Sequence, residues 1–191
     1  MFIAVALTAG STNAWCCCPA LASIANAREY RSRYMNVDYR MSVDLPHGMV
    51  GVGMPPPNPN HGFTTLIPAT SHSCLSVEVY YVNPDDSAER HRFLKMHRTL
   101  RPGEILDHLE TARKVSSSTE TCNGARFTAL RETLFAIASD RTEGGFPVEE
   151  VEYRISLDAD KDEYASARKL LLAIAKSFRR LPATRSITSP K

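Results

Sequence analysis

The fold of this chain is decided by the stretch VEEVEYRISLDADKDEYASARKLLLAIAKSFRRL, residues Val148–Leu181. From Val151 to Leu157 apolar and polar residues alternate, which is the period of a strand with one buried face. The polar run Asp158–Asp162 then supplies candidate caps and negative charge for the start of a helix. The apolar residues of that helix recur at steps of three and four: Tyr164, Ala167, Leu171, Ile174, Phe178 and Leu181. These two elements predict an α+β fold, in which a long C-terminal helix ending near Leu181 packs on one face of an antiparallel β-sheet.

Earlier segments also have the pattern of strands. They are Val37–Leu45, Met49–Gly53, His61–Pro68 and Cys74–Val82. For Met49–Gly53, a bulged continuation of the first strand is the alternative. The run Ala125–Ser139 fits a helix as well, but the turn-forming residues 140–147 after it favour a hairpin with the final strand, interrupted near Arg131.

The segments between these strands are polar or have helical spacing. Residues 28–33 and 116–124 are expected to be exposed and irregular, and the proline-rich residues 55–60 to form a stiff surface loop. Helices are expected at 88–100 and, with an irregular segment as the alternative, at 105–115.

The N-terminal residues differ from the rest of the chain. Residues 1–27 contain no Asp, Glu, Lys or Arg and end in Ala25-Asn26-Ala27, the A-x-A pattern that precedes a signal peptidase site. We interpret residues 1–27 as a signal peptide, 28–182 as one domain and 183–191 as a flexible tail; a buried helix or a disordered tail is the alternative for the N-terminus. The predicted location is therefore periplasmic or extracellular.

Removal of a signal peptide would leave two cysteines, Cys74 and Cys122. In an oxidising compartment such a pair commonly forms a disulfide, although two buried thiols are the alternative. A bridge would close a loop of nearly fifty residues and stabilise the fold by on the order of 3 to 4 kcal/mol.

Charge and hydropathy exclude two classes of partner. The 191 residues carry a net charge of only +2, without the basic excess that binds a phosphate backbone, so we do not expect a nucleic acid partner. After residue 27, no apolar run approaches the ~20 residues needed to cross a bilayer. The mature chain is therefore expected to have no membrane span.

Three short motifs resemble the PsbP/Mog1-like superfamily of small α+β domains. They are DLP at Asp44–Pro46, YRISL at Tyr153–Leu157 and IAKSF at Ile174–Phe178, within a pattern that extends from Val37 to Leu181. The resemblance implies a central antiparallel sheet with helices packed against it. It also implies a binding or assembly module rather than an enzyme, and it carries over no functional residue.

The segment Pro46–Phe63 is the candidate binding loop. It contains His47 and His61, four glycines and several prolines, and a stiff loop held by strands at both ends loses little entropy on binding. We select His47, His61 and Phe63 as binding residues; a merely stiff connector is the alternative.

No motif of catalysis or metal binding is evident. The histidines lack zinc-site spacing, no serine has the context of a hydrolase nucleophile, and the aspartates at 158, 160 and 162 fit helix capping better than a calcium loop. We expect no catalytic residue, metal or cofactor. The leading hypothesis is a secreted non-enzymatic domain that binds a protein or a cell-envelope component; the alternatives are a small hydrolase whose site forms only in the fold, and an inhibitor or immunity-type protein.

Overall fold

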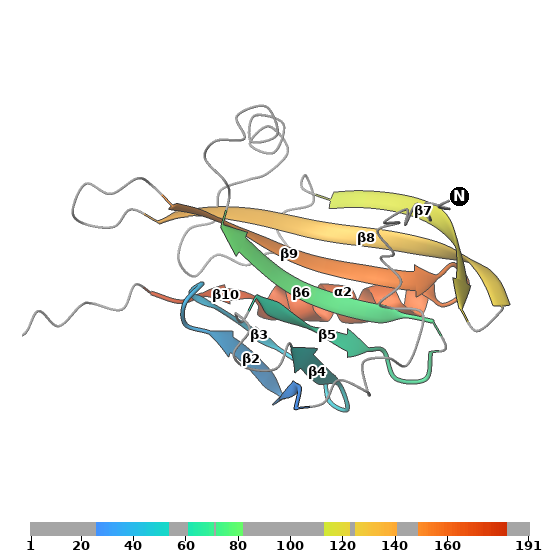
Figure 1. The fold of residues 1–191 in the computed structure, drawn as a ribbon, viewed down its shortest axis with the longest axis horizontal. Helices are drawn as coiled ribbons and strands as arrows, with labels where there is room; N and C mark the ends of the chain where they lie inside the picture. Colours follow the sequence, from blue (N-terminus) through green and yellow to red (C-terminus); the bar gives the residue numbers. More distant parts are fainter. Residues whose placement is uncertain are drawn as a thin grey trace, which may run out of the picture.

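The computed structural model describes residues 26–53, 61–70, 72–81, 113–122, 125–140 and 149–182. In these residues the strands are all paired antiparallel and form two sheets (Figure 1). The seven-stranded sheet has the order β1 (Arg28–Arg31), β4 (Val50–Gly53), β5 (Gly62–Leu66), β6 (Cys74–Tyr81), β9 (Glu149–Asp160), β8 (Ala125–Asp140) and β7 (Arg113–Cys122). The three-stranded sheet has the order β10 (Arg179–Arg180), β3 (Met41–Asp44) and β2 (Arg33–Asn36).

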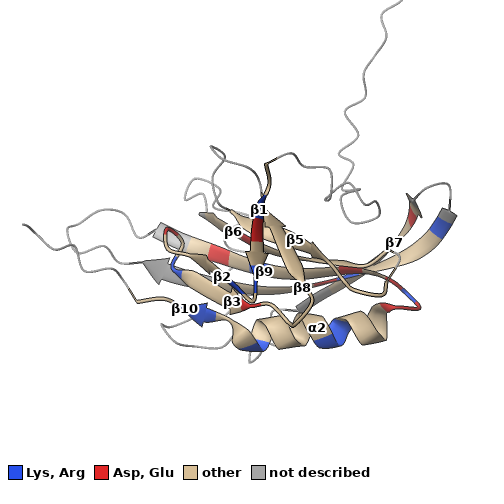
Figure 2. Cartoon of the chain, turned by 90° about the horizontal axis from the view of Figure 1, so that it is seen from below, with Lys and Arg blue, Asp and Glu red and all other residues tan. Residues whose placement is uncertain are grey.

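The predicted packing of a C-terminal helix on an antiparallel sheet is confirmed. Helix α2 (Tyr164–Ser177) lies along one face of the large sheet (Figure 2). Leu171 of the helix and Phe178 just after it are fully buried, together with Leu75, Ile155 and Leu157 from the centre of the sheet. The small sheet closes the same core, since Tyr34 of β2 packs against Phe63 of β5 with ring centroids 4.9 Å apart and an interplanar angle of 56°.

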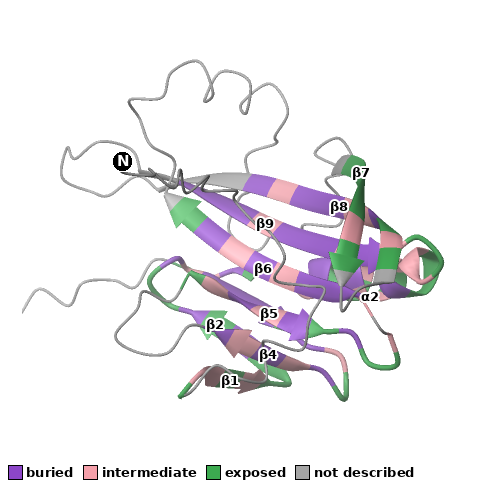
Figure 3. Cartoon of the chain, turned by 45° about the vertical axis from the view of Figure 1, so that its right-hand side comes forward, coloured by how far each residue is buried: buried purple, intermediate pink, exposed green. Residues whose placement is uncertain are grey.

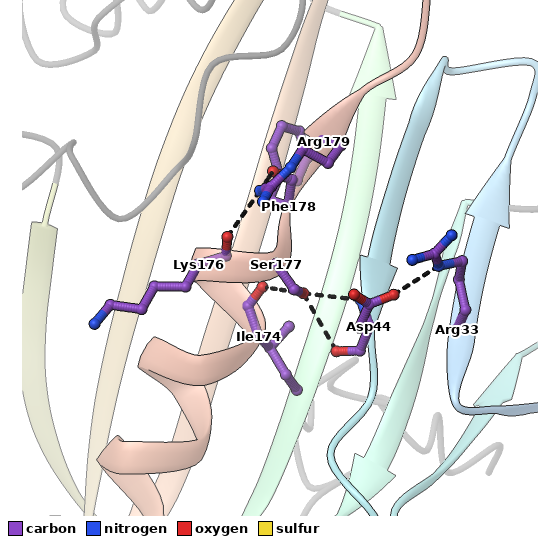
Figure 4. A network of polar contacts seen from close by, with 7 residues as sticks. All are labelled: Arg33, Asp44, Ile174, Lys176, Ser177, Phe178 and Arg179. Atoms are coloured by element: carbon purple, nitrogen blue, oxygen red, sulfur yellow. Dashed lines mark hydrogen bonds and ion pairs between the residues drawn. The ribbon is translucent and has the colours of Figure 1, made fainter.

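The helix is shorter than the apolar stripe predicts. It ends at Ser177 rather than Leu181, because Phe178 has an extended backbone (φ −57°, ψ 132°) and the chain continues as strand β10. Ser177 fixes this end: its hydroxyl accepts a hydrogen bond from the Asp44 amide (2.8 Å) and donates to the Ile174 carbonyl (2.7 Å), as Figure 4 shows. Ser177, the last residue of the helix, therefore also links the helix to β3 through hydrogen bonding to Asp44.

The start of the helix also differs from the prediction. Strand β9 continues to Asp160, and the residue before the helix is Glu163, whose side chain makes no capping hydrogen bond to the helix. Asp160 instead accepts a hydrogen bond from the Asp162 amide at 3.0 Å and so stabilises the turn between strand and helix.

The N-terminal third contains more strands than predicted. The expected exposed lead, residues 28–33, instead forms β1 and the start of β2, which continues to Asn36. The predicted strand Val37–Leu45 begins only at Met41, because residues 37–40 form a turn in which Arg40 has φ 52° and Val37 is exposed. The predictions for Met49–Gly53, His61–Pro68 and Cys74–Val82 are confirmed as β4, β5 and β6.

Three predictions for the segment around residues 105–139 are wrong. The expected polar loop 116–124 and the end of the expected helix 105–115 form the ten-residue strand β7, up to Cys122. Strand β8 pairs with β9 as predicted, but it is continuous over 16 residues and has no break at Arg131. Arg131 stays in the sheet because Asp158, its neighbour on β9, accepts two hydrogen bonds from it.

Several predicted elements lie outside the described residues. These are the signal peptide up to residue 25, the proline-rich loop 55–60, the helix 88–100, residues 105–112 of the second helical segment and the tail 183–191.

Candidate functional site

The face of the large sheet that is turned away from α2 carries polar side chains in its central strands. Leu75, Val77 and Val79 of β6 lie in the core, so the alternate residues Ser76, Glu78 and Tyr80 lie on the other face. Register places them beside Ser156, Arg154 and Glu152 of β9, respectively.

Arg154 is the centre of an aromatic and ionic cluster on this face. Its guanidinium carbon lies 5.1 Å from the ring centroid of Tyr80 and 5.8 Å from that of Phe135 on β8. Its Nε and Nη2 donate to the two carboxylate oxygens of Glu152, at 2.5 and 3.2 Å. A forked ion pair and two aromatic faces hold the guanidinium in one orientation.

Tyr80 joins this cluster to His61, the residue directly before β5. The two rings are stacked, with centroids 6.2 Å apart and an interplanar angle of 15°. His61 Nδ1 lies 2.9 Å from the Tyr39 hydroxyl and 3.3 Å from the Val79 carbonyl oxygen. Because a carbonyl oxygen can only accept, this contact favours a proton on Nδ1. We define the Tyr80 surface as His61, Tyr80, Phe135, Glu152 and Arg154.

Neighbouring groups shift the pKa values of the arginine and the tyrosine of this surface. Burial alone would lower the pKa of Arg154, but the hydrogen bonds and charge of Glu152 raise it more, so the guanidinium stays charged. The pKa of Tyr80 is also raised, first by burial and then by the charge of Glu78. At neutral pH the surface therefore combines the Arg154–Glu152 ion pair with a protonated phenol, and Tyr80 is 39% exposed.

The structure separates the three residues selected from the candidate loop. His61 and His47 are both exposed, but they lie at opposite ends of β5: His61 precedes it, whereas His47 lies in the turn before β4, which pairs antiparallel with β5. Phe63 is only 3% exposed and packs between Tyr30 and Tyr34. Of the three, only His61 belongs to the Tyr80 surface, and Phe63 is a core residue.

Tyr80 and Arg154 could have been identified from the sequence. Both occupy outward positions of strands whose inward residues are apolar, and a tyrosine and an arginine at outward positions are unlike the small or acidic residues beside them. Their proximity required the register of β6 against β9, which the sequence does not specify.

Cys74 lies at the start of β6 and is disulfide-bonded. Its sulfur is therefore no thiol nucleophile. The pairing with Cys122 stays a prediction, because the side chain of Cys122 lies outside those described.

The neighbours of Cys74 have structural contacts. Ser73 donates its hydroxyl to the Glu163 carboxylate at 2.6 Å, which joins the start of β6 to the start of α2. The His72 ring stacks on Phe127, with centroids 4.7 Å apart. These contacts give the hydrolase alternative no nucleophile activated by a histidine at residues 72–74.

The described part of the chain contains no group of three or more His, Cys, Asp or Glu side chains able to hold a metal ion. None of its helices has the length and apolarity required to span a bilayer.

Comparison with models of known protein families finds no match, and no curated protein is significantly similar in sequence. Solved structures do show similarity. A protein from Bacteroides thetaiotaomicron matches with a TM-score of 0.45 and 8% identity over 80% of this chain, which spans 49% of that protein's length. A cyanobacterial PsbP from Synechocystis matches with a TM-score of 0.35, 13% identity and coverage of 82% and 94%.

A third match is LpqN from Mycobacterium tuberculosis, a protein involved in cell envelope biogenesis, with a TM-score of 0.29, 12% identity and coverage of 82% and 86%. The predicted resemblance to PsbP-like proteins is confirmed as a weak structural similarity. At these TM-scores it bears on no question of function.

Proposed function

We propose that this protein is a non-enzymatic, extracytoplasmic binding domain and that it contacts a partner protein through the Tyr80 surface. The observation that supports this best is the alignment of His61, Tyr80 and Arg154, in which each side chain is held by a neighbour before any partner arrives. Tyrosine and arginine are the residue types that most often dominate binding energy at protein interfaces.

Restraint of these side chains would favour tight association. Immobilising a flexible side chain at an interface costs about 0.5–1.5 kcal/mol, and Arg154 is already restrained by Glu152 and two rings. Tyr80 is 39% exposed and lies beside the forked Arg154–Glu152 ion pair. A partner with an apolar side chain next to polar groups that can hydrogen-bond to this ion pair would complement both features.

The disulfide of Cys74 supports a location outside the cytoplasm. Disulfides persist in oxidising compartments and are rare where thiols are kept reduced. Strand β1 begins at Arg28, directly after the proposed signal peptide. A mature chain that began at this residue would keep every described strand.

The test is capture of a partner by the full chain from an envelope extract of the native host, followed by titration of the purified partner. Tyr80→Ala is expected to weaken its affinity by roughly 30-fold, the effect of a hot-spot residue worth about 2 kcal/mol. Met35→Ala is the control, because Met35 is 56% exposed but lies on β2 of the small sheet. Equal affinity of wild type and Tyr80→Ala, with unchanged melting temperatures, would reject the Tyr80 surface.

A further inference from the structure

The two edges of the large sheet are built differently. One edge is β1, which has four residues and three charged side chains, Arg28, Glu29 and Arg31. The other edge is β7, which has ten residues, of which the five from Val115 to Thr119 carry no charge. Short and charged edges are how proteins prevent unwanted strand pairing, and a long uncharged edge invites it. Strand β7 carries its charged residues, Arg113, Lys114 and Glu120, only on either side of the uncharged run, so its middle lacks this protection.

Strand β7 is also exposed on both of its faces. All side chains from Val115 to Thr119 are exposed, including alternate residues that point to opposite sides (Figure 3). The tip of the β7–β8 hairpin extends beyond β9, whose pairing with β8 ends at Ala129. A two-stranded segment without a covered face is marginally stable alone, so it gains from another strand.

The backbone register shows which groups of β7 point outward. Only two residues separate Cys122 from Ala125, so these two form the hydrogen-bonded closing pair of the hairpin. Hydrogen-bonded pairs alternate along an antiparallel ladder, so residues 120, 118, 116 and 114 bond to β8. Ser117 and the other odd-numbered residues therefore have their N–H and C=O groups on the outer side, where none of the described strands pairs with them.

We propose that β7 pairs antiparallel with β7 of a second copy of this chain, around a two-fold axis at Ser117, so that two large sheets become one. In this register Ser117 lies opposite its own equivalent, and residue 114, a lysine, lies opposite residue 120, a glutamate. Opposite charges facing each other across an antiparallel pair are favourable, and the symmetry supplies this pair twice.

The charges distinguish this register from the other one that pairs nine residues. Centring the pair on Ser118 would place Lys114 opposite Cys122 and Glu120 opposite Ser116, with no opposite charges facing each other. When a two-fold axis perpendicular to the sheet relates two identical antiparallel strands, it passes between one residue and that residue's own equivalent. A register centred between two neighbouring residues is therefore excluded. The occupant that fits β7 is thus a second β7.

The first experiment measures the mass of the full chain by sedimentation equilibrium over a wide concentration range. The wild type is expected to form dimers, and Ser117→Pro to raise the dissociation constant at least about tenfold, because proline removes an outward N–H from each copy. Ser117→Ala is the matched control and should dimerise like the wild type. Proline is tolerated at outward positions of edge strands, and an unchanged circular dichroism spectrum would verify the fold.

The second experiment uses only the wild-type sequence. A carbodiimide joins a lysine directly to a carboxylate, and an equal mixture of unlabelled and isotopically labelled chains identifies links between copies. A mixed-isotope link from Lys114 to Glu120 is expected; six residues apart in one extended strand, these side chains cannot be joined within a chain. A purely monomeric chain, dimers insensitive to Ser117→Pro, or links only between other segments would each overturn the proposal.

Discussion

Replacing Arg168 by methionine is expected to destabilise the fold by about 2 to 4 kcal/mol. Arg168 lies on α2 and donates through Nε to Glu132 of β8 at 2.8 Å, while the Tyr164 hydroxyl donates to the same carboxylate oxygen at 2.5 Å. Glu132 has no exposed surface. Removing one partner of a buried ion pair costs about 3–5 kcal/mol, because a charge stays buried without it.

The lower end of the range reflects the position of Arg168. Its side chain is 33% exposed, so water screens part of the interaction that methionine would remove. Methionine keeps the aliphatic length of arginine and is a good helix former, so packing and helix propensity change little. The loss of stability should therefore come mainly from the removed charge and the removed hydrogen bond.

Urea denaturation of the disulfide-intact protein measures this free energy of unfolding. Lys169→Met is the matched control: the residue is adjacent and exposed, and the change should stay within about 0.5 kcal/mol. A triple variant with Glu132→Leu, Tyr164→Phe and Arg168→Met should recover most of the loss, since an apolar cluster of similar volume can replace a buried ion pair.

Two results would refute this reasoning. If Arg168→Met were as stable as Lys169→Met, the buried carboxylate would not depend on its arginine. If the triple variant were no more stable than Arg168→Met, the loss would come from packing around the helix rather than from an uncompensated charge.

Further predictions concern backbone conformation, titration and the disulfide. Gly62→Ala should cost several times more stability than Gly48→Ala. Both glycines have positive φ, but a Cβ at Gly62 would lie 1.9 Å from a carbonyl oxygen of β6, whereas a Cβ at Gly48 would meet open space. Equal melting temperatures of the two variants would contradict this prediction. Burial raises the pKa of Tyr34 to about 12. The folded state thus keeps a proton that the unfolded chain loses near pH 10, and stability should fall as pH rises from about 10 to about 12. An absorbance titration should show one late phenolate step that Tyr34→Phe lacks; titration of every tyrosine near pH 10 would be the contrary result. Peptide mapping under non-reducing conditions should recover Cys74 linked to Cys122, and a link from Cys74 to any other cysteine would exclude that pairing.

The sequence specified the part of the fold in which each element has one apolar face. Leu171 and Phe178 of the terminal segment and Leu75 of β6 are buried as their spacing predicts, because burial of such residues is the main favourable term in folding. The helix end was misplaced because Phe178 continues the apolar stripe although its backbone is extended.

Strand β7 could not be predicted from hydropathy. Its residues from Val115 to Thr119 are exposed on both faces, so they show no alternation, and three consecutive serines are typical of a loop. A signal was nevertheless present: Asn123-Gly124 is the dipeptide most characteristic of a two-residue hairpin turn. Strand β2 was missed for a related reason, since one of its two buried residues, Asn36, is polar and bonds to the Tyr34 hydroxyl.

The candidate site was only partly predictable. His61 was selected because it lies in a stiff loop, and it does lie beside Tyr80, but Phe63 two residues later points into the core. Residues two apart in a strand normally lie on the same face of the sheet. His61 and Phe63 do not, because His61 precedes the strand and Gly62 has φ 133°. Sequence could identify the segment but not the direction of its side chains.

The pairing of β10 with β3 has a consequence for the order of events in biosynthesis. The Leu181 amide donates to the Arg40 carbonyl at 2.7 Å, and these two residues are 141 positions apart in the chain. The ribosome must therefore have synthesised the chain beyond Leu181 before the small sheet can acquire its third strand. Until then β2 and β3 lack the strand that completes their layer, and this contact between distant parts of the chain forms late in folding.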